Sequence, residues 1–231
     1  FLGRFGGRRR QLYPDKLSDA ELGGPVDEMV GVPVFRVMAH HEGALLIGNT
    51  PGDPGIVRRS APGFPGTFPA KDWCYPDSGG AEITGLASHA GRALAFTEAG
   101  TYDVTDIGHP VQLARGIGCV APRSIGYLPD GRMIWLSRDG FYAMTARGEL
   151  GPVSGEIHRL VTAGLNRGRL RRAVSTFDAR SREYLCAVAP AGRDVQRLVL
   201  RFDGENWKEQ DLGFDIADMC TTDDYRQLTL F

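Results

Sequence analysis

Residues 91–105 read GRALAFTEAGTYDVT, and the same pattern returns without a gap 40 residues later, where residues 131–145 read GRMIWLSRDGFYAMT. Five positions are identical in the two copies, and apolar residues stand at the same places. In the first copy Leu94 and Phe96 are two residues apart, as are Tyr102 and Val104, which is the spacing of side chains on one face of a β-strand. Each copy therefore predicts a β-hairpin.

The rest of the chain is built in the same way, from short apolar runs separated by turn residues. Residues 43–48 predict a strand that resumes at 56–57 after a loop over 49–55, and a fourth unit has strands at 184–188 and 197–202. A period of about 40 to 50 residues made of strands is typical of propeller blades. We expect an all-β fold, a β-propeller of four-stranded antiparallel blades, of which about four lie within residues 32–231.

The repeat also predicts a register. Four apolar side chains of the first copy should superpose on those of the second and be buried between sheets. The expected pairs are Leu94 with Ile134, Phe96 with Leu136, Tyr102 with Tyr142, and Val104 with Met144.

Two further elements accompany the blades. Residues 1–31 read as a basic N-terminal arm, with Arg4, Arg8, Arg9 and Arg10 and a capping-box pattern at 18–21. Between the third and fourth units, Ser154 is expected to cap a short helix that packs across the blades as a plug or lid. Its apolar face would carry Ile157, Leu160, Val161 and Leu165.

Composition excludes several classes of protein. The 231 residues hold 27 Lys and Arg against 28 Asp and Glu, so net charge does not direct the chain to nucleic acid or to an acidic membrane surface. No apolar run approaches the ~20 residues that span a bilayer, and we expect a soluble protein. The four cysteines include no C-x-x-C pair, which argues against a zinc ribbon.

Two short motifs resemble functional sites but fit structural roles better. Residues 116–121 match the dinucleotide pattern G-x-G-x-x-A, yet Pro122 and a strand-like segment follow where a helix is needed. Residues 202–207, FDGENW, are similar to the Asp-box turn of sialidases but depart from its spacing. We expect a glycine-rich corner between blades and a tight hairpin turn with Trp207 packed between blades.

Catalytic chemistry is not expected. The acidic residues available for hydrolysis all lie at predicted turns, where aspartate is common for local reasons. His40, His41 and Glu42 are adjacent on a strand and alternate between its faces, so they cannot converge on one metal ion. No Ser/His/Asp set is apparent, and we expect no enzyme activity, no catalytic residues, no cofactor and no metal. The acidic residues considered are Asp103, Asp106, Asp139, Asp178 and Asp203.

The succession of motifs resembles the β-propeller tail proteins of short-tailed bacteriophages, the nozzle, tail-tube B or head-to-tail hub class. The likeness runs over about residues 32–215 and rests on four stretches, together with Tyr102. These are RRSAPGFPGTFP at 58–69, EITGL at 82–86, GIGCVAPRS at 116–124 and WLSRDGFY at 135–142.

That resemblance implies a structural virion protein, made in the host cytoplasm and located in the tail, that forms a ring below the portal. It implies a homo-oligomer, contacts with other tail or portal-adaptor proteins, and non-specific contact with genomic DNA. The alternative is a glycan-binding or glycan-cleaving propeller, which would need aromatic and acidic residues gathered at one mouth of the ring.

Charge that is balanced overall but separated locally indicates how subunits would meet. A basic segment of one copy could face an acidic segment of its neighbour in a head-to-tail ring. The arginines at 167–172 could also be a solvated linker between blades, or could face DNA in the channel. The expected interaction residues are Arg8, Arg9, Arg10, Arg167, Arg169, Arg171 and Arg172 on the basic side, and Asp211, Asp215 and Asp218 on the acidic side.

Overall fold

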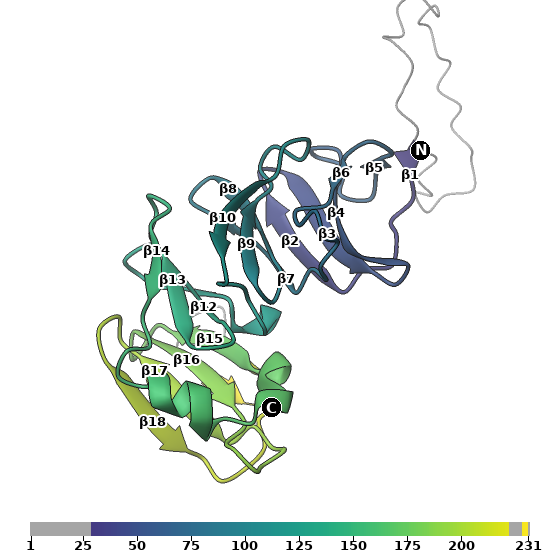
Figure 1. The fold of residues 1–231 in the computed structure, drawn as a ribbon. Helices are drawn as coiled ribbons and strands as arrows, with labels where there is room; N and C mark the ends of the chain where they lie inside the picture. Colours follow the sequence, from purple (N-terminus) through teal and green to yellow (C-terminus); the bar gives the residue numbers. More distant parts are fainter. Residues whose placement is uncertain (1–28, 222–227, 231) are drawn as a thin grey trace, which may run out of the picture.

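The chain folds into four antiparallel four-stranded sheets, arranged one after another along an arc (Figure 1). This is a computed structural model, and it describes residues 29–221 and 228–230. In each of these four sheets the strands follow the order of the chain, so each sheet is formed by one continuous stretch of 27 to 38 residues that turns back three times.

The first and second sheets occupy the N-terminal half of the arc. The first contains β2 (Val37–His41), β3 (Ala44–Thr50), β4 (Asp53–Arg59) and β6 (Trp73–Cys74). The second contains β7 (Gly85–His89), β8 (Arg92–Phe96), β9 (Gly100–Asp103) and β10 (Val111–Arg115).

The third and fourth sheets repeat this arrangement. The third contains β11 (Gly126–Tyr127), β12 (Met133–Leu136), β13 (Phe141–Met144) and β14 (Leu150–Pro152). The fourth contains β15 (Val174–Asp178), β16 (Glu183–Val188), β17 (Leu198–Phe202) and β18 (Trp207–Asp211).

Two small sheets flank the arc. β1 (Met29–Val30) pairs with β5 (Phe68–Pro69) beside the first sheet, and β19 (Met219–Thr221) pairs with β20 (Leu228–Leu230) beside the fourth. Strand β19 packs next to β15, just as β7 packs next to β2 and β15 next to β11. The first strand of each sheet is therefore the innermost, and β19 continues that inner row.

The predicted repeat is confirmed. The two hairpins form β8–β9 and β12–β13, and their apolar faces are buried between sheets, with Tyr142 only partly covered. Leu94 and Phe96 pack toward the third sheet, while Tyr102 and Val104 pack toward the first. In each hairpin the apolar pair on the first strand faces the next sheet and the pair on the second strand faces the previous sheet, so the hairpin needs both neighbours to bury its side chains.

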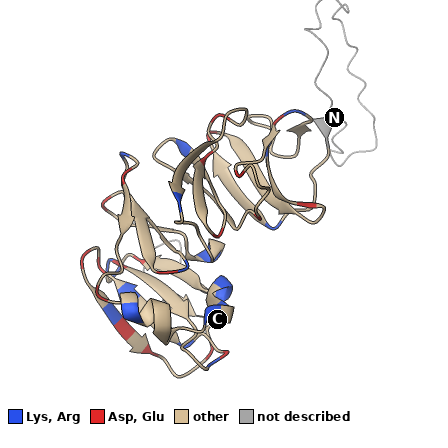
Figure 2. Cartoon of the chain, viewed as in Figure 1, with Lys and Arg blue, Asp and Glu red and all other residues tan. Residues whose placement is uncertain are grey.

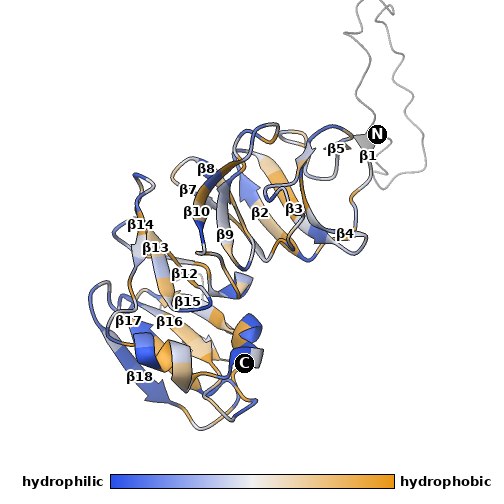
Figure 3. Ribbon diagram, in the orientation of Figure 1, coloured by the Kyte–Doolittle hydropathy of each residue, from blue (hydrophilic) through white to orange (hydrophobic). Residues whose placement is uncertain are grey.

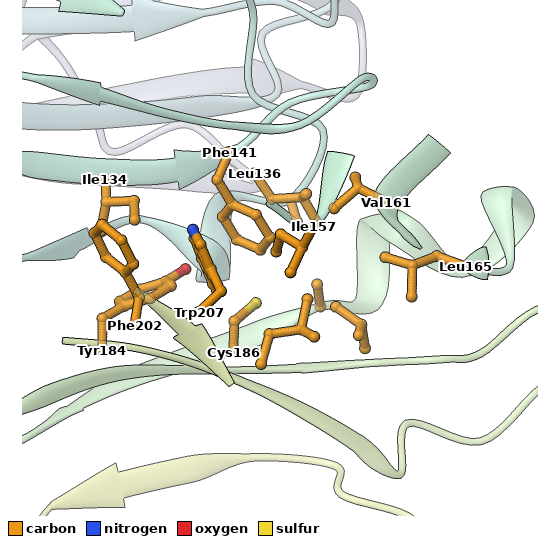
Figure 4. Close-up of a cluster of buried hydrophobic side chains, with 14 of the residues drawn as sticks. Ile134, Leu136, Phe141, Ile157, Val161, Leu165, Tyr184, Cys186, Phe202 and Trp207 are labelled. Carbon is orange, nitrogen blue, oxygen red and sulfur yellow. The ribbon is translucent and has the colours of Figure 1, made fainter. Parts of the chain in front are cut away.

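Apolar clusters fill the spaces between neighbouring sheets, and Figure 3 shows the central strands as the most hydrophobic parts of the ribbon. The largest cluster lies between the third and fourth sheets (Figure 4). Phe141, Phe202 and Trp207 stack there, with ring centroids 4.6 Å apart in the two pairs that Trp207 makes. The expected burial of Trp207 between blades is therefore confirmed.

The helical segment between the third and fourth sheets does not begin at the expected residue. A π-helical turn covers Leu160–Gly164 and is preceded by Arg159, not capped by Ser154. Ser154 Oγ instead accepts a hydrogen bond from the backbone N–H of Phe141, the first residue of β13, at 3.1 Å. The apolar face is as expected, since Ile157, Val161 and Leu165 are buried in the largest cluster.

Two 3-10 segments complete the described chain, η1 (Pro122–Ser124) before the third sheet and η3 (Arg167–Arg172) before the fourth. The expected loop at 49–55 is shorter than predicted, because β3 runs to Thr50 and β4 begins at Asp53. Asn49 takes a φ of 57° at an irregularity between the two strands, so a bulge replaces much of the loop. No helix among the described residues is long and apolar enough to cross a membrane.

Candidate functional site

Figure 2 shows basic residues on the short helical segments beside the fourth sheet. η3 enters β15, η1 enters β11, and Glu82 lies three residues before β7. Because the inner strands are neighbours, their starts lie on the same side of the arc. We call this side the mouth.

Three arginines of η3 reach different sheets from the mouth, and we name Arg167, Arg169 and Arg171 the arginine hub. Arg171 Nη2 lies 3.1 Å from Glu82 Oε2 and 3.0 Å from Glu98 Oε1, both of the second sheet's turns. Arg167 Nη1 donates to the carbonyl of Arg138 in the third sheet. Arg169 Nε donates to Asp194 Oδ1 of the fourth at 3.1 Å, so the hub joins three successive sheets.

The hub carboxylates are stabilised in their charged form. The side-chain amide of Asn49 donates to Glu82 at 2.9 Å, and this bond, assisted by Arg171, lowers the pKa of Glu82. The hydrogen bond from Arg169 lowers the pKa of Asp194 in the same way. The hub groups are partly exposed to water, which weakens each pair.

A small cavity lies against the hub. Its volume is about 190 Å³, and it is lined by Ala81, Glu82, Thr97, Glu98, Ala99 and Arg171. Since Arg171 already lies between both carboxylates, any ligand of this acidic pair would have to displace a guanidinium.

The predicted acidic residues are also paired within the chain. Asp211 accepts from Arg197 Nε at 2.7 Å, and Asp215 accepts from the backbone N–H of Gln196 at 2.7 Å. Asp218 forms an ion pair with Arg123 of η1. The structure therefore does not bring the predicted basic and acidic groups together within one chain, and their pairing between subunits stays a prediction.

Of the other basic residues proposed for interaction, Arg172 is exposed next to the hub. Arg8, Arg9 and Arg10 lie outside the described residues, as do Arg4 and the capping-box pattern at 18–21.

The aspartates considered for hydrolysis are engaged locally. Asp103 Oδ1 accepts from the Thr105 hydroxyl at 2.6 Å, and Asp178 Oδ2 from the Ser181 hydroxyl at 2.7 Å. Asp203 accepts from two backbone N–H groups of its own hairpin turn. Asp106 and Asp139 likewise contact His109 and Tyr142, three residues away in each case. Such turns are the ordinary role of aspartate.

The opposite end of the inner strands holds a contact that the sequence did not reveal. His41 Nδ1 lies 2.9 Å from Ser88 Oγ, although the two residues are 47 positions apart. His41 Nε2 is buried without a hydrogen-bond partner among the described residues, and its nearest carboxylate, Glu42, is 3.9 Å away. The only sequence signal is that β2 and β7 each end in histidine, which became meaningful once the two strands were known to be neighbours.

His40 and His41 do alternate, as expected, with His40 exposed and His41 buried. Among the described residues no three histidine, cysteine, aspartate or glutamate side chains lie together as a metal site. All four cysteines are free, and Cys220 alone among them is exposed. Burial raises the pKa of Cys119 and Cys186 to about 12, so these thiols remain protonated at neutral pH.

The residues that join one sheet to the next recur along the arc. Arg59 at the end of β4 donates to the carbonyl of Thr105 in the second sheet at 3.4 Å. Arg132 Nη2 donates to the carbonyl of Gly204 in the fourth sheet at 2.7 Å. Arg201 occupies in the fourth sheet the position that Arg59 occupies in the first. Each arginine lies on the third strand of its sheet and pairs with a leucine of the second strand, Arg59 with Leu46 and Arg201 with Leu185.

No protein-family model and no curated protein matches the chain. Solved structures match its fold at low identity. Virginiamycin B lyase from Staphylococcus aureus is 11% identical over 88% of this chain and 67% of its own, with a TM-score of 0.53. A chain of the mitotic checkpoint complex is 8% identical over 84% of this chain and 59% of its own, with a TM-score of 0.50. The extracellular domain of BT4673 from B. thetaiotaomicron is 9% identical, over 87% and 26%, with a TM-score of 0.54.

These similarities concern the fold alone, because proteins with such different names share it. The chain spans between a quarter and two thirds of the length of these structures. Its four successive sheets, each packed on the next around a row of inner strands, are the blades of a β-propeller.

Proposed function

We propose that this chain is a structural and interaction protein of a bacteriophage tail, a propeller component of a ring below the portal. The observation that carries the proposal is where the resembling motifs lie. Two of them, 82–86 and 116–124, lead from one blade into the next, and 135–142 contacts the second of these connections, so most of the sequence that resembles tail propellers helps to build the arc.

The corner at 116–124 supports this directly. A side chain at Gly118 would fall 2.1 Å from the carbonyl oxygen of Thr97, so only glycine fits there. The carbonyl of Gly118 accepts from Trp135 Nε1 at 3.1 Å, and Ser124 Oγ accepts from the backbone N–H of Leu136 at 2.9 Å. Residues of two motifs, 116–124 and 135–142, thus hold each other at the junction of the second and third blades.

The arginine hub agrees with a scaffold role. It joins three blades at the mouth, where the inner strands begin, and so links them on that side of the arc. A protein that has to hold a ring in shape under load from packaged DNA benefits from such cross-links.

Co-sedimentation tests the proposal. Phage particles produced from the genome that encodes the chain would be banded in a density gradient, and the fractions probed with antibody to the purified protein. We expect the protein in the particle band. Protein that stays at the top of the gradient while intact particles band below would contradict a virion role.

One observation favours the alternative, glycan binding. Trp73 and Tyr75 lie half exposed, with ring centroids 5.6 Å apart, and the Tyr75 hydroxyl contacts Asp53. They stand on the outer edge of the first blade, and not at the mouth of the ring, where we expect such a group from the sequence. Exposed aromatic faces beside a carboxylate suit sugar rings. A glycan array that binds the wild-type protein, but not Trp73→Ala, would favour this second function.

A further inference from the structure

The fourth blade leaves an apolar groove on the face that points away from the third. Five of its lining residues are apolar, Leu185, Val199, Leu212, Met219 and Leu230, and its volume is about 220 Å³. Asp178, Arg201 and Gln210 line the rest of the groove. β19 and β20 cover only the inner part of this face, where Met219 and Leu230 pack on Val174, Leu185 and Val199.

The groove continues an interface that the molecule uses three times already. Every other pair of neighbouring blades is sealed by four strands on each side, whereas β19–β20 supplies two. Among the described residues, no strand pairs with the second edge of β20, so its N–H and C=O groups face outward next to the groove. An extended strand laid along β20 would extend that small sheet over the groove.

The other end of the same arc offers such a strand. Residues 31–35, GVPVF, connect β1 to β2 outside any strand and make no hydrogen bond to another described residue. Val32 and Val34 are 51% and 73% exposed, and in an added β-strand their side chains would share one face, because they are two residues apart. Leaving two valines in water is unfavourable unless another apolar surface covers them.

The proline of this segment sets which edge can pair. Backbone groups of residues two apart point to the same edge, so Val32 and Val34 present complete N–H and C=O groups on one side. Pro33 lacks an N–H and blunts the opposite side. The segment is therefore suited to add one strand to an existing sheet and to stop further addition.

We propose that residues 31–35 of a second copy of this chain add as a strand to the free edge of β20, with Val32 and Val34 in the groove. The contact is head-to-tail, because the first-blade end of one copy meets the fourth-blade end of the next. It rests on the proposed ring-forming function, for which it names the partner and the contact.

Sedimentation velocity over a range of concentrations tests this contact on the full chain. The wild-type protein should associate as concentration rises. Val34→Asp should weaken the association by at least about tenfold, since a charge would enter an apolar groove. Leu212→Asp should do the same from the groove side. Val111→Asp changes an equally exposed valine on the outer strand β10, at neither end, and should leave association intact.

Mixing the two defective variants gives the sharpest result. Val34→Asp keeps an intact groove and Leu212→Asp keeps an intact strand, so the mixture should form heterodimers and nothing larger. If circular dichroism shows that Leu212→Asp is unfolded, Gln210→Trp serves instead, because it fills the groove from an exposed position.

Three outcomes would overturn the contact. These are a wild-type protein that stays monomeric throughout, a Val34→Asp variant that associates normally, and a mixture that fails to form heterodimers. The test is independent of the virion test. If the protein associates but does not band with phage particles, the proposed function is contradicted and the contact stands. If the protein bands with phage particles but the Val34→Asp variant associates as strongly as the wild type, the contact is contradicted and the proposed function stands.

Discussion

The two faces of the fourth blade are built from the same five-residue and six-residue strands, yet they differ in chemistry. On the face toward the third blade, β16 and β17 present Tyr184, Cys186, Leu200 and Phe202, all of them buried. On the opposite face Glu183 stands at the start of β16, where Arg201 and Lys208 pair with its carboxylate. One face is apolar throughout its cluster, and the other places ion pairs beside Leu185 and Val199.

The difference bears on whether the outer face of the fourth blade is an exposed surface or an interface. Ion pairs near a surface tolerate water, whereas an apolar cluster must be covered completely. The second blade carries a similar pair, Arg92 with Asp103 at 3.5 Å, with the charges in the opposite order. Since that pair faces the third blade, a charged strand end is compatible with a covered face, and the outer face of the fourth blade has the composition of an interface.

The largest loss of stability should come from the face of the fourth blade that packs on the third. Phe202→Ala removes a side chain that is 2% exposed and stacks on Trp207, so it leaves a cavity inside the largest cluster. We expect the free energy of unfolding in urea to fall by about 3–5 kcal/mol.

Leu185→Ala is the matched variant on the other face of the same sheet. It should cost about 2 kcal/mol, the low end for leucine, because the groove lets its surroundings relax. If the leucine variant lost as much as the phenylalanine variant, the two faces would not differ as described.

A smaller loss of stability is expected at the corner formed by residues 116–124, which leads into the third blade. Ser124→Ala removes the oxygen that accepts from the buried N–H of Leu136, and the N–H is left without a partner. An unsatisfied buried donor costs about 1–3 kcal/mol. Thermal and urea unfolding would measure it. Ser175→Ala is the control, since that hydroxyl donates from a partly exposed position to the carbonyl of Arg123, and it should cost less.

The fold and the site differ in how far the sequence predicts them. The hairpin at 91–105 could be placed from spacing alone, because strand periodicity and turn glycines are local signals. The arginine hub could not be placed, because its partners Glu82, Glu98 and Asp194 come from segments up to 89 residues away. The contact between His41 and Ser88 depends likewise on which inner strands are neighbours.

Local signals also failed where two readings competed. Ser154 matches a helix cap, yet its hydroxyl accepts from the backbone N–H of Phe141 in β13. The run at 167–172 reads as a linker or as a binding patch, and in the structure three of its arginines form contacts within the chain. Charge alone does not say whether a partner lies within the chain.

The stability that the outer face of the fourth blade contributes should depend on pH. Burial opposes the charge of Glu183, but hydrogen bonds from Arg201 and Lys208 prevail, and the pKa of Glu183 falls below its ordinary value of 4.5. A lowered pKa in the folded state adds stability at pH values above the unfolded pKa, and that stability is lost as pH falls through the folded pKa.

Glu183→Gln should therefore cost about 1–2 kcal/mol at pH 7, a range reduced because Lys208 and Arg201 are partly exposed. The difference between wild type and variant should shrink as the pH is lowered below about 4.5, the ordinary pKa of a glutamate. Urea titrations between neutral pH and pH 3 would measure it. A difference that stays constant over that range would show that the carboxylate charge does not stabilise this face.

The smallest effect should come from the arginine hub, where both ion pairs of Arg171 are partly exposed. Arg171→Ala removes a guanidinium that is 54% exposed and contacts Glu82 and Glu98. Exposed pairs contribute little, so the loss should stay below about 1 kcal/mol at low salt and vanish near 1 M salt, where the screening length is about 3 Å. Arg172→Ala, which changes the next exposed arginine, is the control; its charge acts on Asp194 without the two carboxylate contacts that Arg171 makes, so it should cost less than Arg171→Ala at low salt. Urea unfolding at the two salt concentrations distinguishes the possibilities. A loss at Arg171 as large as that of Ser124→Ala, and insensitive to salt, would mean that the mouth holds the arc together as firmly as the closed junctions do.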